Sequence, residues 1–341
     1  MLRLAIVQHN RPRLTVSVAL CTYNGARFVR EQLRSILTQS PPPDQLVVSD
    51  DGSTDGTLEA IRAELDLLPR DLRDRLDVVI LENASPLGVT RNFESAVRAC
   101  AGDLIVLSDQ DDIWAPDRLA VALQEFDERP DLLLLHGDAR LVDDAGVPLG
   151  TTLFEAIEFT PSEREEVRAG GAFEVLLRRN VATGATIAFR RGLLNHAIPF
   201  SDVWVHDEWL AIVAAAAGTV DFLSRPIIDY RQHTDNQIGA DKPTLHVKIG
   251  RLREPRDERN QHLVGRVEAL LGRVIGLGDA VHGGVVDLVK GKLDHERFRR
   301  DLPVTPLFRV APVLAEMAKG GYRRFGRAHY DVLRDLVQPD T

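Results

Sequence analysis

The sequence predicts an α/β protein with a mainly parallel sheet, helices on both faces of the sheet, and a C-terminal helical extension. Over the first 130 residues, short apolar runs that suit buried strands alternate with stretches in which apolar residues recur at helical spacing. Polar or acidic turns follow several of these strands, and only helical periodicity remains after about residue 240. Ligands of open α/β sheets bind at the carboxyl ends of strands, so the turns are the first candidates for function.

Composition places the chain among ordinary globular proteins. It has 341 residues, of which 44% are apolar and 27% charged, enough for one large domain or two smaller ones. The net charge of -9 disfavours general nucleic-acid binding, which needs an electropositive surface. No apolar run approaches the ~18 residues of a membrane span, and the N-terminal residues do not resemble a signal peptide. Cys21 and Cys100 form no metal-ligand or disulfide pattern, so we expect a reduced, cytoplasmic protein.

The first two predicted strands both run into polar turns. Residues 16–20 (VSVAL) lead into CTYNG, and residues 45–49 (QLVVS) lead into DDGSTDGT, each followed by a helix. Asp55 suits a cap for the second helix, whereas Asp50 and Asp51 precede the turn. A carboxylate at this position can accept a hydrogen bond from a base or ribose. A plain strand-to-helix connection is the alternative for either turn.

A third strand is predicted over residues 77–82, followed by an amphipathic helix over residues 89–101. Arg91 lies near the start of this helix, where backbone N–H groups favour an anion. Arg91 therefore suits a phosphate or a base, although an ordinary surface arginine fits the same position.

The fourth strand, residues 104–107, ends in the most unusual turn of the chain, SDQDDIW. Asp109, Asp111 and Asp112 follow a buried strand, where like charges repel and desolvation makes their ionisation costly. A divalent cation such as Mg²⁺ or Mn²⁺ removes that conflict and also accepts phosphate oxygens. A solvated acidic turn is the alternative. If strands one, two and four are parallel, their three turns share one edge of the sheet.

Two later stretches carry further candidate residues. Thr183 and Gly184 lie among small residues that allow either close approach of a ligand or a packing contact. In VWVHDEW, Asp207 and Glu208 lie between tryptophans, where a carboxylate can gain the raised pKa of a general base. Asp207 equally suits a helix N-cap. His233 is either a metal ligand or a structural loop histidine.

The remaining segments complete the expected organisation. Residues 132–135, 220–223 and 227–230 are further predicted strands, and residues 151–171 are expected to form an irregular surface excursion. We predict an N-terminal extension over residues 1–14, a domain over residues 15–240 and a helical region over residues 241–341. This last region has a net charge of about +5, against about -14 for the first 240 residues. Its two arginine clusters suit anionic lipid, although interleaved acids favour a solvated helix face: Arg251, Arg253, Arg256 and Arg259, then Arg323, Arg324 and Arg327.

These motifs resemble those of a known enzyme family. CTYNG, VVSDDGSTDGT, GVTRNF and LSDQDDIW are similar to the motifs of inverting glycosyltransferase family 2, which has the GT-A fold. HDEW and YRQHTDN resemble the rhamnosyltransferase-type members. The resemblance involves six ordered motifs and covers about residues 15–240, leaving the last ~100 residues unexplained.

The resemblance implies a role for each candidate residue. Asp207 takes the place of the catalytic base, and the adjacent Glu208 competes with it for that role. The residues predicted to hold the nucleoside diphosphate are Thr22, Tyr23, Asn24, Asp50, Asp51, Arg91 and Asp109. The predicted metal ligands are Asp109, Asp111, Asp112 and His233. The predicted sugar and acceptor contacts are Thr183, Gly184, Trp204, Glu208 and Trp209.

The expected activity is inverting transfer of a hexosyl or rhamnosyl group from a dTDP- or UDP-linked sugar, with Mn²⁺ or Mg²⁺ as cofactor. The expected acceptor is a hydroxyl of a glycan or a lipid-linked molecule in cell-surface polysaccharide synthesis. We expect a cytoplasmic enzyme at the inner face of the membrane, with peripheral contact through its C-terminal region. One alternative is an inactive nucleotide-sugar-binding module. The other is a nucleotidyltransferase, which would need a glycine-rich, basic phosphate loop that CTYNGARF does not provide.

Overall fold

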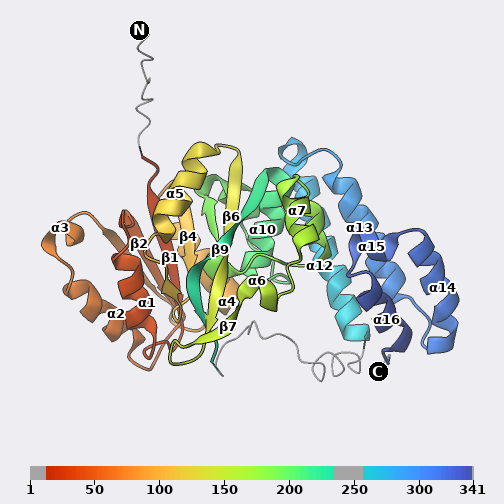
Figure 1. Cartoon of the computed structure of the whole chain (residues 1–341), viewed down its shortest axis with the longest axis horizontal. Helices are drawn as coiled ribbons and strands as arrows, with labels where there is room; N and C mark the ends of the chain where they lie inside the picture. The colour runs from red at the N-terminus through yellow and green to blue at the C-terminus, as the bar shows by residue number, and fades with distance from the viewer. Residues whose placement is uncertain (1–12, 234–255, 340–341) are drawn as a thin grey trace, which may run out of the picture.

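The computed structural model describes residues 13–233 and 256–339, and it has a central sheet with helices on both sides and a helical C-terminal part (Figure 1). The sheet has the order β3-β2-β1-β4-β8-β6-β9-β5, with β7 paired to β6. The strands are β1 (Val16–Thr22), β2 (Gln45–Asp50), β3 (Asp77–Glu82), β4 (Leu104–Ser108), β5 (Ile113–Trp114), β6 (Leu132–Val142), β7 (Pro148–Thr152), β8 (Ala188–Arg190) and β9 (Thr219–Arg231).

The first half of the sheet is parallel, as the alternation of strands and helices predicts. β1 lies between β2 and β4, β3 pairs with β2, and all three pairings are parallel. The second half is mixed, because β8 runs antiparallel to both β4 and β6. The two late strands predicted over residues 220–223 and 227–230 form one strand, β9. It continues past Pro226 through a register shift against β6, and a bulge is a position where a strand tolerates proline.

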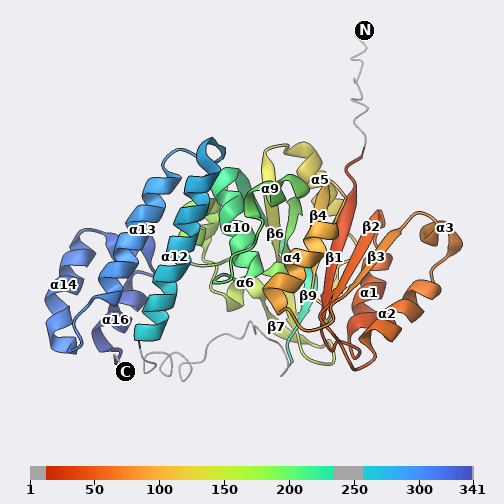
Figure 2. The same cartoon turned by 180° about the vertical axis from the view of Figure 1, so that it is seen from behind.

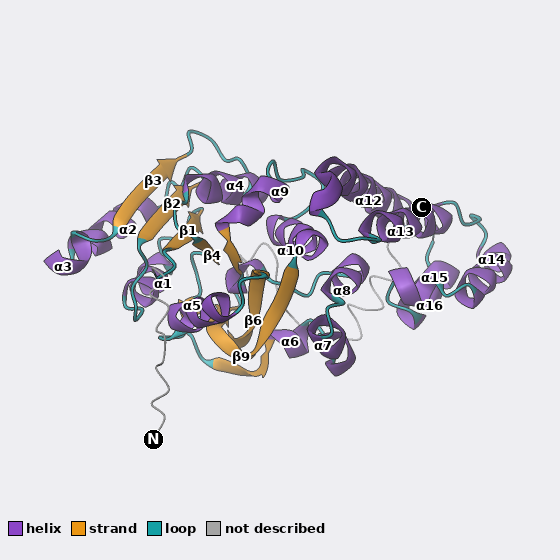
Figure 3. Cartoon of the chain, turned by 90° about the horizontal axis from the view of Figure 1, so that it is seen from above, coloured by secondary structure: helices purple, strands orange, loops and turns teal. Residues whose placement is uncertain are grey.

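Alternate side chains of β1 build two separate cores. Val18 and Leu20 pack with apolar residues of α1, α2 and α5, whereas Ala19 and Cys21 face α4, α8 and α10. Figure 3 shows α4 and α9 on one side of the parallel strands and α1 and α5 on the other. The helices of this part are α1 (Val29–Leu37), α2 (Thr57–Asp66), α3 (Arg70–Arg73), α4 (Val89–Ala99), α5 (Arg118–Glu128), α6 (Leu153–Ala156), α7 (Pro161–Arg168), α8 (Ala172–Arg178), α9 (Leu194–Ala197) and α10 (His206–Ala217).

The prediction of an irregular surface excursion over residues 151–171 is wrong. The segment contains α6 and α7, and each starts with a capping box, built by Thr152 with Glu155 and by Thr160 with Glu163. Phe154 and Phe159 are buried in the main core. Helices of four and eight residues are too short to show apolar periodicity, so the capping residues were the signal that periodicity missed.

The described part of the C-terminal region is helical and contributes no strand to the sheet (Figure 2). Val264, Val267 and Leu270 of α12 pack into the same core as α4 and α10, and His282 N–H donates to the Ala216 carbonyl at 2.8 Å. The boundary predicted near Gly239 lies outside the described residues, so the division at residue 240 stays a prediction. The helices are α12 (Asp257–Leu277), α13 (Val285–Arg300), α14 (Pro306–Ala318), α15 (Gly321–Phe325) and α16 (His329–Val337).

Buried ion pairs hold the outer helices together. Arg299 of α13 donates to Asp335 Oδ2 at 2.7 Å and lies 3.3 Å from Asp331, and all three side chains are buried. Arg256 is also buried, donating to the carbonyls of Arg299 and Leu302. It is therefore not part of a surface cluster for lipid, as one sequence interpretation suggested, and Arg251 and Arg253 lie outside the described residues.

Candidate active site

The carboxyl ends of β1, β2 and β4 meet at one edge of the sheet. Thr22 pairs with Asp50 across β1 and β2, and Leu20 pairs with Ser108 across β1 and β4. The parallel pairing therefore brings the three polar turns together, as predicted. The end of β9 joins the same edge, because Arg231 donates from its backbone N–H to Asp112 Oδ1 at 3.1 Å.

Asp50 and Asp51 both use their carboxylates to shape this edge. Asp50 accepts from Thr22 Oγ1 at 2.6 Å and from the backbone N–H of Ser53 at 2.8 Å. Asp51 accepts from the backbone N–H groups of Leu87 at 2.8 Å and Gly88 at 2.9 Å, which fixes the loop before α4. Both acids are buried, so their carboxylates lie beneath the surface of this edge.

Gln110 connects the turn after β1 to the acidic turn after β4. Its Oε1 accepts from the Tyr23 N–H at 2.8 Å, and its Nε2 donates to the Tyr23 carbonyl at 3.0 Å. The Tyr23 side chain remains exposed, and Asn24 takes a left-handed conformation with φ 49° while its Oδ1 accepts from Thr54 N–H at 2.9 Å. The sequence analysis missed Gln110, whose only signal was its place within the acidic motif.

The acidic turn crowds three carboxylates into a poorly solvated place. Burial, together with the charges of Asp111 and Asp207, raises the pKa of Asp109 to about 7. Burial also raises the pKa of Asp112 well above its usual range, again with its acidic neighbours contributing. Among the described residues, Asp112 Oδ2 is buried without a hydrogen-bond partner. Ionisation of both Asp109 and Asp112 is therefore unfavourable in the arrangement of the described residues.

His233 comes from the end of β9 to the same turn. Its Nε2 lies 2.8 Å from Asp111 Oδ2, and its ring stacks on Phe28 with the centroids 4.9 Å apart. The histidine is thus held in a fixed orientation beside the acidic motif, some 120 residues away in sequence.

Two buried arginines support the acidic turn from behind. Arg118 stacks over the Trp114 ring at 3.9 Å and donates to the Leu107 carbonyl at 3.2 Å. Burial lowers the pKa of Arg118 to about 9, opposed by the charges of Asp112 and Asp109. Arg231 donates from Nε to the Asp111 carbonyl at 2.9 Å. Sequence reasoning missed both, because a helix or strand position alone does not reveal which buried charge it will face.

Asp207 lies in the first turn of α10 and is buried. Its Oδ2 accepts from the Gly184 N–H at 2.9 Å, and its Oδ1 accepts from the Glu208 N–H at 2.6 Å. The cap position belongs to Val205, so the N-cap interpretation of Asp207 is wrong. Burial raises the pKa of Asp207 to about 6 despite these hydrogen bonds. A Cβ on Gly184 would lie 2.8 Å from His206 Nε2, so this close approach requires glycine.

Glu208 points to a partner in the C-terminal region. It forms an ion pair with Arg266 of α12, and the Arg266 guanidinium lies 3.9 Å above the Trp204 ring. Trp204 in turn donates from Nε1 to the Arg266 carbonyl at 2.9 Å. Burial raises the pKa of Glu208, and the charge of Arg266 opposes this shift. Arg266 was absent from the predicted site, because nothing in the sequence of α12 indicates which face meets α10.

We expect Arg266→Gln to lower the free energy of unfolding by about 1–3 kcal/mol, because it leaves the mostly buried Glu208 without its partner. The matched control is Arg297→Gln, which removes the pair between Arg297 and Glu268, 2.8 Å apart on the solvent face. That exposed pair is worth about 0–1 kcal/mol. Urea unfolding of both variants measures the difference, and equal losses would contradict the assigned importance of Arg266.

Three other residues predicted for the site, Arg91, Thr183 and Trp209, make their hydrogen bonds and ion pairs with other parts of the protein. Arg91 donates to Glu94 at 2.6 Å and also pairs with Asp202, so its charge is shared between two acids. Thr183 presents its carbonyl to the Thr186 N–H at 2.9 Å. Trp209 is buried and donates to the Ala197 carbonyl at 2.7 Å, which makes it part of the core rather than a surface contact.

Comparison with known proteins places this arrangement in a family. Residues 17–195, just over half of the chain, match the model of glycosyl transferase family 2. The chain belongs to this family. The polar turns after β1, β2 and β4 all lie within the matched segment, whereas Asp207, His233 and the C-terminal helices lie beyond it.

This family 2 glycosyltransferase also resembles individual proteins. It is 28% identical to a dTDP-rhamnosyl transferase of Shigella flexneri over 231 residues, which is 65% of this chain and 74% of that protein. It is 25% identical to an uncharacterized protein of Mycobacterium tuberculosis over 300 residues, 83% of this chain and 81% of that one. The chain is therefore a transferase enzyme of the glycosyltransferase type.

Solved structures confirm the predicted GT-A fold. A mannosyltransferase from Pyrobaculum calidifontis, in complex with GDP-Man and Mn²⁺, matches with a TM-score of 0.53 at 20% identity, over 95% of this chain and 84% of that one. TarS 1-349 of S. aureus in complex with UDP-GlcNAc matches with a TM-score of 0.53 at 16% identity, over 94% and 90%. Against a longer TarS structure, at a TM-score of 0.52 and 18% identity, the match covers 84% of this chain and 44% of that one.

The acidic edge of the glycosyltransferase fits a hard divalent cation. Three carboxylates belong to the acidic turn, the His233 imidazole contacts Asp111, and the buried Asp112 Oδ2 has no partner among the described residues. Within residues 13–233 and 256–339, no three His, Cys, Asp or Glu side chains are grouped closely enough to form a ready metal site. The donor types are those that Mn²⁺ or Mg²⁺ accepts.

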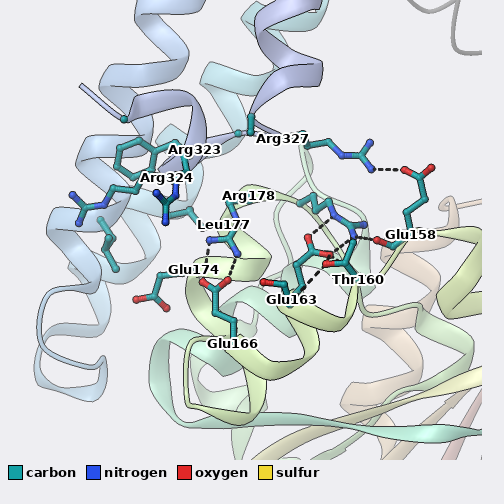
Figure 4. Close-up of a pocket in the computed structure, with 17 residues that line it drawn as sticks. Glu158, Thr160, Glu163, Glu166, Glu174, Leu177, Arg178, Arg323, Arg324 and Arg327 are labelled. Carbon is teal, nitrogen blue, oxygen red and sulfur yellow. Dashed lines mark hydrogen bonds and ion pairs between the residues drawn. The ribbon is translucent and has the colours of Figure 1, made fainter. Parts of the chain in front are cut away.

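A cavity of about 780 Å³ lies elsewhere, between α7 and α8 on one side and α15 on the other (Figure 4). Its walls carry ion pairs, among them Glu166 with Arg178 at 2.5 Å and Glu163 with Arg179 at 2.8 Å. None of the predicted site residues lines it. Its acids and arginines largely neutralise one another, and we assign it no part in catalysis.

Proposed function

We propose that this glycosyltransferase transfers a sugar with inversion from a nucleoside-diphosphate sugar to a hydroxyl of a glycan or lipid-linked acceptor. The observation that carries the proposal is the environment of Asp207. This buried carboxylate has a pKa raised to about 6 and lies near enough to the acidic turn for its charge to raise the pKa of Asp109. A base of this strength beside a diphosphate-binding edge suits the deprotonation of a hydroxyl.

The donor would lie across the ends of the parallel strands. The turn from Thr22 to Asn24 and the loop fixed by Asp51 form the nucleoside side, with Asp50 beneath and Arg91 at the start of α4. Asp109, Asp111, Asp112 and His233 would hold a divalent cation against the diphosphate. The 28% sequence identity to a dTDP-rhamnosyl transferase supports dTDP-linked rhamnose as the first donor to test, with UDP-linked sugars second.

The reaction would proceed by one displacement. Asp207 takes the proton of the acceptor hydroxyl while its oxygen attacks the anomeric carbon from the side opposite the leaving diphosphate. Asp109, Asp111, Asp112 and His233 would hold a Mn²⁺ or Mg²⁺ ion, which would supply stabilisation of the negative charge on the leaving diphosphate. Gly184 and Glu208 donate backbone N–H bonds that fix the Asp207 carboxylate, and Thr183, Trp204 and Glu208 line the acceptor side, with Trp209 behind them.

A glycan or lipid-linked acceptor would place the enzyme near a membrane. We propose a role in cell-surface polysaccharide synthesis, in the cytoplasm at the inner face of the membrane, with the C-terminal helices making the contact. Among the described residues, no helix is long and apolar enough to cross a bilayer. The net charge of about +5 on residues 241–341 supports an attraction to anionic lipid.

A panel of nucleotide sugars tests the proposal. The full chain is incubated with dTDP-, UDP- and GDP-linked sugars, each with and without Mn²⁺, and release of the nucleoside diphosphate and thermal stabilisation are both recorded. We expect release and stabilisation with at least one donor, both dependent on Mn²⁺. Stabilisation without release under any acceptor condition would identify an inactive binding module. The absence of both stabilisation and release with every donor would overturn the proposal.

The transfer rate is expected to rise with pH through about 6, because Asp207 acts only when ionised and burial raises its pKa to about 6. At pH 5 the rate should be about tenfold below its plateau near pH 8. Stability should follow the opposite sign: folding raises this pKa from 3.8, so the contribution of Asp207 is fully present below pH 3.8 and is lost as the pH rises through about 6. Donor affinity measured at each pH separates loss of the base from loss of binding, and a rate independent of pH between 5 and 8 would exclude Asp207 as the base.

A further inference from the structure

Helix α14 presents its apolar residues to solvent and turns its charged residues inward. Leu307 is 75% exposed, Phe308 67% and Leu314 55%, while Val304 just before the helix is 70% exposed. Leu307 and Leu314 lie seven residues apart, which places them on the same face of the helix. Figure 1 shows α14 as the outermost helix, at the opposite end of the molecule from α3. The exposure of these side chains shows that the described part of the chain leaves this face uncovered.

The two charged residues of α14 both point into the protein. Arg309 is fully buried and donates to the carbonyls of Pro303 at 2.6 Å and Gln338 at 2.6 Å. Glu316 Oε1 lies within hydrogen-bond distance of His295 Nδ1, at 2.9 Å. From Pro303 to Ala318, every exposed side chain is uncharged, and Lys319 is the first exposed charged residue after them. This pattern is the reverse of a helix that packs on its own protein and faces water.

The charge near α14 distinguishes two possible partners for its apolar face, a membrane and a second copy of the chain. From Lys319 to Tyr330 the chain contains Lys319, Arg323, Arg324 and Arg327 and no acidic residue. Arg323, Arg324 and Arg327 line the cavity beside α7 and α8, where Arg327 pairs with Glu158, so Lys319 at the end of α14 is the cation that adjoins the apolar face. An apolar face that ends at an exposed lysine complements the apolar interior and anionic headgroups of a bilayer. A second copy of the chain would bring the same cation of each copy to the interface, and like charges at the edge of an interface oppose association.

We propose that α14 is an interfacial anchor, with Leu307, Phe308 and Leu314 entering the headgroup region of an anionic membrane and Lys319 meeting its phosphates. This inference rests on the membrane contact proposed above and assigns it to one helix face. The anchor would hold the glycosyltransferase beside a lipid-linked acceptor without a membrane-spanning segment.

Vesicle flotation tests the anchor with the full chain and no donor sugar. We expect the protein to float with vesicles of phosphatidylcholine containing about 30% phosphatidylglycerol, and at least about tenfold less with phosphatidylcholine alone. The variant Leu307→Gln/Phe308→Gln/Leu314→Gln should lose flotation by at least about tenfold, because each change removes exposed apolar area that would enter the lipid. Flotation of this variant equal to the wild type, or no flotation of the wild type, would overturn the proposal.

A matched control uses exposed apolar residues far from α14. Leu67→Gln/Val147→Gln/Leu149→Gln changes side chains that are 73%, 57% and 49% exposed, and it should float like the wild type. Both triple variants should keep the wild-type melting temperature and donor hydrolysis, because none of these side chains is buried or part of the proposed site. A wild-type protein that floats with the vesicles but hydrolyses no donor would contradict the proposed function and leave the membrane anchor supported.

Sedimentation velocity without vesicles tests the competing occupant. We expect the wild type and the α14 variant both to be monomers. A wild-type dimer that the α14 variant dissociates would show that a second copy covers this face, and it would overturn the membrane assignment.

Discussion

Asp207→Asn is expected to lower the rate of sugar transfer by about 10²–10⁴, the usual contribution of a general base, with little change in donor affinity. The asparagine oxygen can still accept from one of the two N–H groups that now bond the carboxylate, those of Gly184 and Glu208. The lost hydrogen bond costs about 1 kcal/mol, and removal of a buried charge offsets part of that cost. We therefore expect melting within about 3 °C of the wild type.

Glu208→Gln is the matched control, since it changes the adjacent carboxylate of the same helix turn. Successive side chains on a helix point about 100° apart, and Glu208 faces Arg266 rather than Gly184. The rate should therefore fall far less than in Asp207→Asn. Transfer rates and calorimetric donor affinities of the two variants decide the assignment. Full activity in Asp207→Asn, or inactivity confined to Glu208→Gln, would show that Asp207 is not the catalytic base.

Asp111→Ala is expected to abolish the tightening of nucleoside-diphosphate binding by Mn²⁺, a loss of at least about tenfold in affinity. The Asp111 carboxylate lies 2.8 Å from His233 and beside the two buried acids, so its removal takes away one ligand and its contact with the imidazole. Calorimetric titration of UDP and dTDP, with and without Mn²⁺, measures the effect. The fold should survive, because the Asp111 side chain is partly exposed.

Asp117→Ala provides the control for general loss of negative charge. Asp117 follows the same turn but pairs with Arg225 on the surface at 2.8 Å, and its removal should leave the Mn²⁺ effect unchanged. If Mn²⁺ still tightens nucleotide binding in Asp111→Ala, the metal assignment fails. Equal losses in the two variants would indicate a nonspecific charge effect.

The parallel half of the fold could be predicted from the sequence because its strands are continuous apolar runs. β1, β2, β3 and β4 begin and end within two residues of the ranges that the apolar runs predict. Buried parallel strands and their polar ends are local features, and the parallel register brings the ends together without further information. For this reason the acidic turn and the turn after β1 were identified together from the sequence.

Features that depend on contacts between distant segments could not be predicted. Arg266 reaches Glu208 from 58 residues away, and Gln110 bonds the turn after β1 across 87 residues. The inverted face of α14 was equally hidden. Apolar periodicity shows that a helix has two faces, but only the packing of Arg309 and Glu316 shows that its charged face is the inner one.

The anomeric configuration of the first product tests the central proposal most directly. A donor that the enzyme hydrolyses slowly is followed by one-dimensional NMR, and the free sugar is observed before it mutarotates. Single displacement assisted by Asp207 predicts that a donor with an α-linked diphosphate releases the β anomer first, and that Asp207→Asn slows this release. First release of the α anomer by the wild type would show retention and contradict the proposed mechanism.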